Sequence, residues 1–134
     1  MKTIIAGSRA IRDYGVVARA IQESGFEITE VLSGGAQGVD SLGEVWANGN
    51  HVPVKRFPAK WKRYGSKAGP IRNQQMADYA DALVAVWNGK SSGTRDMIKK
   101  ARKCGLKVFV YRVCQPRGRD LRENQVPYGV RLAA

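Results

Sequence analysis

Histidines, cysteines and acidic residues are scarce in this chain, and each shortage argues against a class of site. The single histidine is His51, and the two cysteines, Cys104 and Cys114, have neither the CxxC spacing of a metal or redox site nor a histidine cluster beside them. We therefore expect no metal and no cofactor. Two cysteines without such a pattern are typical of a reducing compartment, so the expected location is the cytoplasm.

Long apolar runs are missing as well. The apolar run that opens the sequence, Met1–Gly7, has about half the length of a secretory signal, and no run approaches the length of a membrane span. We expect a soluble protein with no membrane partner.

Acidic residues are so few that basic residues dominate the charge. Of the 134 residues, 23 are Lys or Arg and 11 are Asp or Glu, which gives a formal net charge of +12. The excess is spread over residues 55–72, 99–107 and 112–122 and does not form one basic tail. Such a field attracts polyanions, so nucleotide phosphates and nucleic acid are both candidate partners, and a solvated surface accounts for much of the excess equally well.

Short apolar runs alternate with segments of helical periodicity from residue 2 to residue 113. The pattern predicts strands at Lys2–Ala6, Ile28–Ser33, Val52–Phe57, Ala82–Trp87 and Lys107–Val113. It predicts helices between the cap Asp13 and Gly25, over Ser41–Asn48, from Gly69-Pro70 onward, and over Thr94–Lys103. This alternation implies an α/β fold: a single Rossmann-like, doubly wound parallel sheet with helices on both faces.

The Rossmann-like domain is expected to cover residues 1–113. Residues 114–134 have no clear period, carry Pro116, Pro127 and several arginines, and are predicted to form a basic C-terminal extension, either a tail or an addition to the edge of the sheet.

Helical spacing also indicates which side of each helix is buried. The predicted buried residues of the first two helices are Tyr14, Val17, Ala18 and Ile21, then Leu42, Val45 and Trp46. Those of the last two are Ile71, Met76, Ala77 and Ala80, then Met97, Ile98 and Ala101.

Polar turns rich in small residues follow three of the strands. They span residues 7–9, 34–40 and 88–94. In a doubly wound sheet, ligands bind outside the carboxyl ends of the strands. The amides of residues 91–94 also open a helix, where free N–H groups and the positive end of the helix dipole favour an anion. We predict a phosphate site here, although glycines also occur in such turns merely to close them.

Arg72 and Asn73 stand in the first turn of the third predicted helix. They could clamp an anion or an adenine-like edge, or Arg72 could have a structural role, bridging to Asp78 or to a backbone carbonyl. The predicted ligand-binding residues are Gly7, Ser8, Arg9, Gly34, Gly35, Gln37, Gly38, Asp40, Arg72, Asn73, Asn88, Ser91, Ser92, Gly93 and Thr94.

A basic and aromatic segment, residues 60–67, precedes that helix. Its interleaved cations and rings are suited to stacking on a base while holding phosphates. Equally, Trp61 and Tyr64 would anchor the loop to the core or to a second subunit. Apolar residues on the outer helices also fit contacts between subunits, so a homodimer is a candidate assembly.

Four segments, in order, resemble the YspA-like branch of the SLOG superfamily. They are Ile4–Arg9, Leu32–Asp40, Ala68–Asn73 and Val86–Asp96, and the resemblance covers roughly Met1 to Arg112. It implies a Rossmann-like fold whose relatives bind nucleotides or nucleotide-derived ligands. Those relatives include the LOG phosphoribohydrolases, which release cytokinin bases from their ribotides, and the DprA proteins, which bind single-stranded DNA.

The resemblance leaves catalysis unassigned. In the LOG enzymes an arginine and a glutamate carry the chemistry; Arg72 matches the arginine, whereas Met97 occupies the glutamate position and Asp96 comes one residue earlier. Cleavage of an N-glycosidic bond needs a carboxylate, so the catalytic candidates are Arg72, Asp96 and Asp40. Helix capping or dipole matching explains both aspartates as well.

Three functions follow as hypotheses. The first is binding of a nucleotide or nucleotide-derived small molecule, such as an ADP-ribose-like ligand, by a sensor, carrier or sequestering protein. The alternatives are a phosphoribohydrolase of the LOG type and a DprA-like binder of single-stranded nucleic acid.

Overall fold

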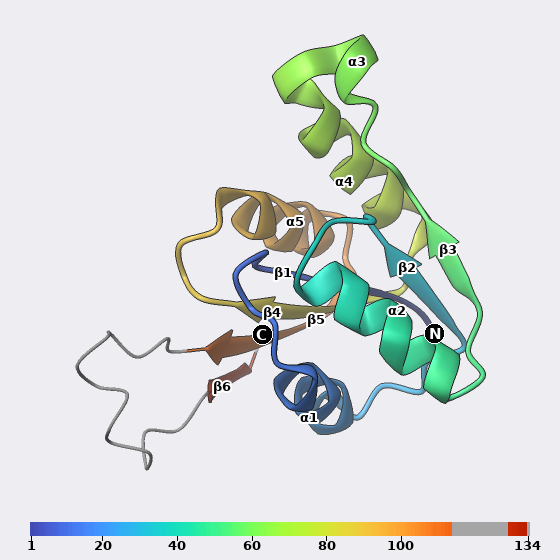
Figure 1. The fold of residues 1–134 in the computed structure, drawn as a ribbon, viewed down its shortest axis with the longest axis vertical. Coiled ribbons are helices and arrows are strands. Elements are labelled where there is room, and N and C mark those ends of the chain that lie inside the picture. The colour runs from blue at the N-terminus through green and yellow to red at the C-terminus, as the bar shows by residue number, and fades with distance from the viewer. Residues whose placement is uncertain (114–128, 134) are drawn as a thin grey trace.

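A sheet forms the centre of the computed structural model, which describes residues 1–113 and 129–133. Its parallel strands are β1 (Lys2–Gly7), β2 (Glu30–Ser33), β3 (Val54–Arg56), β4 (Ala82–Trp87) and β5 (Lys107–Val113). The strand β6 (Gly129–Ala133) pairs antiparallel with β5, and the order across the sheet is β3-β2-β1-β4-β5-β6 (Figure 1).

Helices cover both faces of this sheet. One face carries α1 (Tyr14–Ser24) and α2 (Val39–Gly49), and the other carries α4 (Ala68–Tyr79) and α5 (Ser92–Lys103) (Figure 1). A short helix, α3 (Trp61–Tyr64), and a 3-10 turn, η1 (Gly65–Lys67), precede α4. The expected Rossmann-like α/β fold is therefore confirmed.

The predicted extension, residues 114–134, is described only in β6. Cys114, Pro116 and Pro127 lie outside the described residues, and the boundary at residue 113 stays a prediction. At β6 the chain adds an edge to the sheet.

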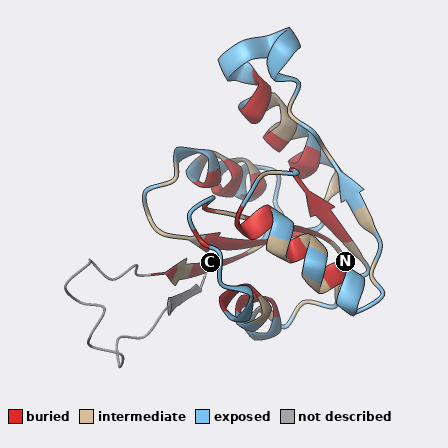
Figure 2. Ribbon diagram, in the orientation of Figure 1, coloured by how far each residue is buried: buried red, intermediate tan, exposed pale blue. Residues whose placement is uncertain are grey.

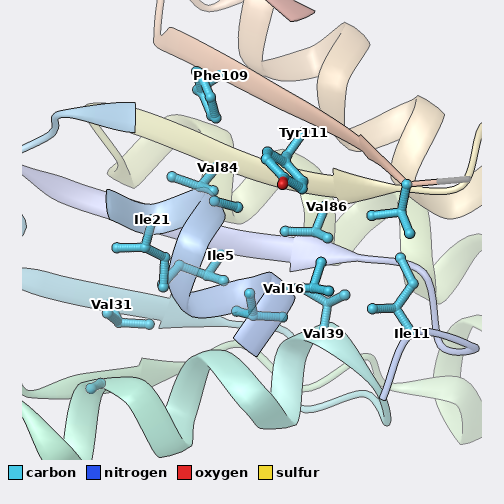
Figure 3. Close-up of a cluster of buried hydrophobic side chains, with 14 residues drawn as sticks. Ile5, Ile11, Val16, Ile21, Val31, Val39, Val84, Val86, Phe109 and Tyr111 are labelled. Atoms are coloured by element: carbon cyan, nitrogen blue, oxygen red, sulfur yellow. The ribbon is translucent and has the colours of Figure 1, made fainter. Parts of the chain in front are cut away.

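The central strands are buried on both faces, which explains their continuous apolar runs. Residues 82–86 of β4 are fully buried, and Ile4 and Ile5 of β1 are as well (Figure 2). Ile5, Val84 and Val86 point toward α1 and α2 and meet Val16 and Ile21 of α1 (Figure 3). Neighbouring residues such as Ile4 and Leu83 point to the opposite face and pack under α4 and α5.

The predicted ends of α1 are confirmed. The side chain of Asp13 accepts a hydrogen bond from Gly15 N at 2.9 Å, as an N-cap does. Gly25 ends the helix in the left-handed conformation with φ of 71°, which glycine adopts without steric cost.

Two predicted core residues are wrong, Tyr14 at the start of α1 and Val45 in α2. Val45 is 54% exposed and Tyr14 is 40% exposed. Gly43 of α2 lies against Ile5, so close that a Cβ on it would come nearer than 3.0 Å to that side chain. This approach turns Gly43 and Ala47 inward and Val45 outward.

The basic and aromatic segment, residues 60–67, was expected to be a loop, but it contains α3 and η1.

In the part of the chain that the structure describes, no helix combines the length and the apolar character that a bilayer crossing requires.

Two valines inside helices provide a test of this packing. Val17 is fully buried, whereas Val45 is half-exposed, and replacing either by alanine changes helix propensity equally. We expect Val17→Ala to lower the free energy of unfolding by about 2 kcal/mol through lost burial and a residual cavity, and Val45→Ala to change it by less than about 0.5 kcal/mol. Urea denaturation measures both values, and equal losses would contradict the described orientation of α2.

Candidate functional site

A cavity of about 840 Å³ opens at the carboxyl ends of β1 and β4. In the sheet, β2 and β3 lie on one side of β1, and β4 and β5 lie on its other side. The strand order therefore reverses between β1 and β4, which is where ligands bind in sheets of this kind. The predicted site residues that line the cavity are Gly7, Ser8, Arg9, Asp40, Arg72, Asn73, Asn88, Ser91, Ser92, Gly93, Thr94 and the catalytic candidate Asp96.

Hydrogen bonds shape the loop between β4 and α5. The side-chain oxygen of Asn88 accepts from Lys90 N at 2.8 Å and from Ser91 N at 3.1 Å, which folds the loop back on itself. Asn88 N donates to Ser8 Oγ at 3.2 Å, and Ser8 is buried. The loops that follow β1 and β4 are therefore joined directly.

The start of α5 presents free backbone donors. Ser91 is the N-cap, and its side chain accepts from Thr94 N at 3.4 Å. Within the described chain, the amides of Ser92 and Gly93 have no hydrogen-bond partner. These amides stand at the positive end of a 12-residue helix and line the cavity, so they are available to an anion.

The glycines of the turn after β2 lie outside the cavity lining. Gly34, Gly35, Gln37 and Gly38 do not line the cavity. Gly38 has φ of 75° and lies against the Ser8 and Arg9 carbonyl groups, where a Cβ would come closer than 3.0 Å. Gln37 accepts a hydrogen bond from Arg12 at 3.3 Å on the surface. The turn packs behind the β1 loop, and its predicted part in ligand binding stays a prediction.

Gly34 lies between the partly buried Arg72 and the buried Asp40. Arg72 Nη1 donates to Gly34 O at 2.6 Å, and a Cβ on Gly34 would lie closer than 3.0 Å to both the Arg72 guanidinium and the Asp40 carboxylate. Burial lowers the pKa of Arg72, although the negative charge of Asp40 opposes the shift. Of the two structural roles considered for Arg72, the geometry shows the bond to a backbone carbonyl.

Asp40, in the first turn of α2, is 6% exposed. Its Oδ2 accepts a hydrogen bond from Ala36 N at 3.2 Å. Burial raises the pKa of Asp40, and this outweighs the Ala36 hydrogen bond and the positive charge of Arg72, which both favour the ionised form.

Asn73 and Asp96 tie α4 to α5. Asn73 Nδ2 donates to Asp96 Oδ2 at 2.9 Å and to Gly93 O at 3.3 Å, while Asn73 Oδ1 accepts from Arg72 Nε at 3.0 Å. Lys100 forms an ion pair with the other oxygen of Asp96. Asp96 is thus bound by the protein itself, and the neighbouring Met97 is buried in the cavity wall.

Several lining residues were absent from the predicted set. They are Trp61 and Ser66 from the α3 and η1 segment, Gly69 and Pro70 from α4, and Lys90 from the β4 loop, besides Met76, Met97 and three alanines. The sequence could have indicated Lys90 as a site residue, because Lys90 lies inside the polar turn between β4 and α5. Trp61 is separated from the glycine-rich turns in the sequence, and only the folding of α3 onto α4 brings it to the cavity.

The strand order and the site at the strand ends define an α/β protein with a Rossmann-like fold. DNA processing protein A (DprA) from Streptococcus pneumoniae has this fold too: it superposes with a TM-score of 0.65 at 19% identity, over 93% of this chain and 56% of that chain. At this identity the likeness concerns the fold alone.

Sequence comparisons identify the family. Residues 1–64 match the family described as "YspA, cpYpsA-related SLOG family". The Gene 61 protein of Mycobacterium phage D29 is 32% identical over 118 residues, which cover 81% of this chain and 94% of that protein. The uncharacterized SPbeta prophage-derived protein YoqJ of Bacillus subtilis is 36% identical over 61 residues, which cover 40% of this chain and 36% of that protein. The chain belongs to the YspA, cpYpsA-related SLOG family.

The raised pKa of Asp40 predicts a pH dependence of stability. The native state binds a proton at Asp40 more tightly than the unfolded chain, so this stabilisation is complete below the ordinary value of 3.8 and is lost as the pH rises through the native pKa. Asp40→Asn keeps the size and one acceptor oxygen but does not titrate. We expect the free energy of unfolding of the wild type, minus that of Asp40→Asn, to fall as the pH rises from about 4 to about 8.

Urea denaturation of both proteins between about pH 4 and about pH 8 measures this difference in the free energy of unfolding. Most other groups titrate alike in the two proteins, so their contributions cancel in the difference. A difference that stays constant or increases with pH would contradict the burial of Asp40.

Proposed function

We propose that the protein binds a nucleotide or a nucleotide-derived ligand of the ADP-ribose type, with the ligand's phosphates at the start of α5, and acts as a sensor, carrier or sequestering protein. The observation that carries this proposal is that the amides of Ser92 and Gly93, which have no hydrogen-bond partner among the described residues, line a cavity at the point where the strand order reverses. Amides at a helix N-terminus bind phosphate without a dedicated cation.

Two cations beside these amides support the proposal. Arg9 and Lys90 line the cavity, and within the described residues neither side chain has a hydrogen-bond or ion-pair partner. Both are exposed, so they can turn toward a diphosphate without breaking a contact in the protein. Arg72 differs, because its guanidinium already holds Gly34 O and Asn73. We infer that Arg9 and Lys90 contact the ligand and that Arg72 mainly positions the cavity wall.

Lys90 and Lys99 allow a charge-matched test. Lys99 is exposed on α5, has no partner in the described chain and does not line the cavity. We expect Lys90→Ala to weaken ADP-ribose binding about tenfold, since it removes a charge-assisted contact, and Lys99→Ala to change it less than about twofold. Isothermal titration calorimetry measures the three affinities.

Equal affinities for the wild type and Lys90→Ala would contradict the assigned role of Lys90. Absence of ADP-ribose binding by the wild type, together with no nucleotide retained in native mass spectrometry of protein purified from cells, would overturn the proposed function itself.

A second candidate function, binding of single-stranded nucleic acid, is favoured by a stretch without acidic residues. Residues 45–77 contain no Asp or Glu and carry Lys55, Arg56, Lys60, Lys62, Arg63, Lys67 and Arg72. Trp61 is 51% exposed and Tyr64 is 37% exposed in the same stretch. Their helix α3 lies at the end of α4 that projects beyond the sheet (Figures 1 and 2). Cations interleaved with exposed rings suit the backbone and bases of a single strand.

Salt dependence tests this candidate. Binding of a labelled single-stranded oligonucleotide through several phosphates falls steeply as salt increases, with a logarithmic slope of about −0.7 per phosphate contact. We expect the double substitution Lys62→Ala and Arg63→Ala to reduce the slope by about 1.4, and the matched double substitution Lys99→Ala and Arg102→Ala on α5 to leave it unchanged. Fluorescence anisotropy gives the slopes, and a flat salt response would eliminate this candidate.

Catalysis of the phosphoribohydrolase type is not proposed. Asp96 is held by Asn73 and Lys100, and Met97 stands where the LOG enzymes have a glutamate.

A further inference from the structure

The cavity lining contains two groups of residues that differ in chemistry. The first group, which we call the phosphate end, consists of the α5 amides that have no partner in the described chain, together with Arg9 and Lys90. The second group comes from the α3, η1 and α4 segment and includes Trp61 and Pro70 beside the polar Ser66, Arg72 and Asn73. A ligand that contacted both groups would therefore combine a phosphate with a flat or apolar part.

Trp61, in the α3 part of this lining, is the residue with an exposed aromatic ring. Its side chain is half-exposed although it lines a cavity, and its indole N–H has no hydrogen-bond partner within the described chain. The ring lies beside Gly69 at the start of α4: a Cβ on Gly69 would be 3.4 Å from Trp61 Cη2. The small residue lets the indole rest against the helix, and the rest of the ring stays uncovered. An uncovered indole in a cavity wall is a stacking surface for a planar group.

The size of the cavity links this surface to the phosphate end. A volume of about 840 Å³ lies in the range of sites that enclose a whole small-molecule ligand and is more than a phosphate group alone would fill. Met76 and Met97 also line it, and their flexible apolar side chains suit contact with a ring.

We propose that Trp61 is the base-stacking residue of this site, so that the ligand is a nucleotide with a planar aromatic base and not a sugar phosphate. This inference rests on the proposed function, because it places the ligand's phosphates at α5. The base then lies on the Trp61 indole, and the sugar spans the distance from this ring to the α5 amides.

The test uses one probe with a base and one without. We expect Trp61→Leu to weaken the binding of ADP-ribose about tenfold, the effect of losing one base–aromatic stack, and to leave the affinity for inorganic pyrophosphate unchanged. Trp61→Phe should retain most of the ADP-ribose affinity, because it keeps an aromatic face. Tyr64→Leu is the matched control: Tyr64 is an exposed ring on the same helix that does not line the cavity, so both affinities should stay at the wild-type values.

Tryptophan fluorescence adds a second measurement. ADP-ribose, but not ribose 5-phosphate, should quench the emission of the wild type, and the quenching should be absent in Trp61→Phe.

An unchanged ADP-ribose affinity in Trp61→Leu would overturn the stacking role, and so would an equal loss for pyrophosphate, which would show that the substitution disturbs the phosphate end. These outcomes leave the proposed function standing, because the wild type still binds ADP-ribose. If the wild type bound neither probe, both the proposed function and this inference would fail.

Discussion

The pairing of β1 with β4 positions the candidate site. Both strands are buried under helices on each face, and they pair in parallel so that Gly7 lies beside Val86 where they end. A Cβ on Gly7 would lie closer than 3.0 Å to the Val86 carbonyl oxygen. Because glycine permits this approach, the next residues come within hydrogen-bond distance, and Ser8 accepts from Asn88 N. The spacing of the two loops at the cavity is thus a consequence of core packing.

A network of buried polar groups completes the wall on the other side. Arg72 reaches from α4 to the carbonyl of Gly34 after β2, with Asp40 beyond it, and Asn73 continues the network to α5. Burying such groups adds little net stability, because desolvation offsets their attraction, but their hydrogen bonds connect the Gly34 loop, α4 and α5 directly. Three segments that are distant in sequence are therefore joined by hydrogen bonds beside the cavity.

Local patterns in the sequence were sufficient for most of the secondary structure. The predicted β4 and β5 have the observed bounds, and the cap at Asp13 is where it was expected, because burial on both faces and capping are properties of short segments. The prediction failed at Val45, where helical spacing indicated burial but the contact between Gly43 and Ile5 places Gly43 and Ala47 on the buried side of the helix. It also missed α3, a helix of four residues that leaves no periodicity to detect.

The sequence by itself determined the fold class and the edge of the sheet at which a ligand would bind, since alternating strands and helices place the carboxyl ends of the parallel strands on one side. Only the tertiary structure decided which polar residues at that edge surround the cavity. It turned the Gly34–Gly38 loop toward Arg72 and the β1 loop, and it brought Lys90 and Trp61 to the cavity instead. The reason is that a cavity depends on distances between segments far apart in the chain, and these distances are set by how helices pack on the sheet.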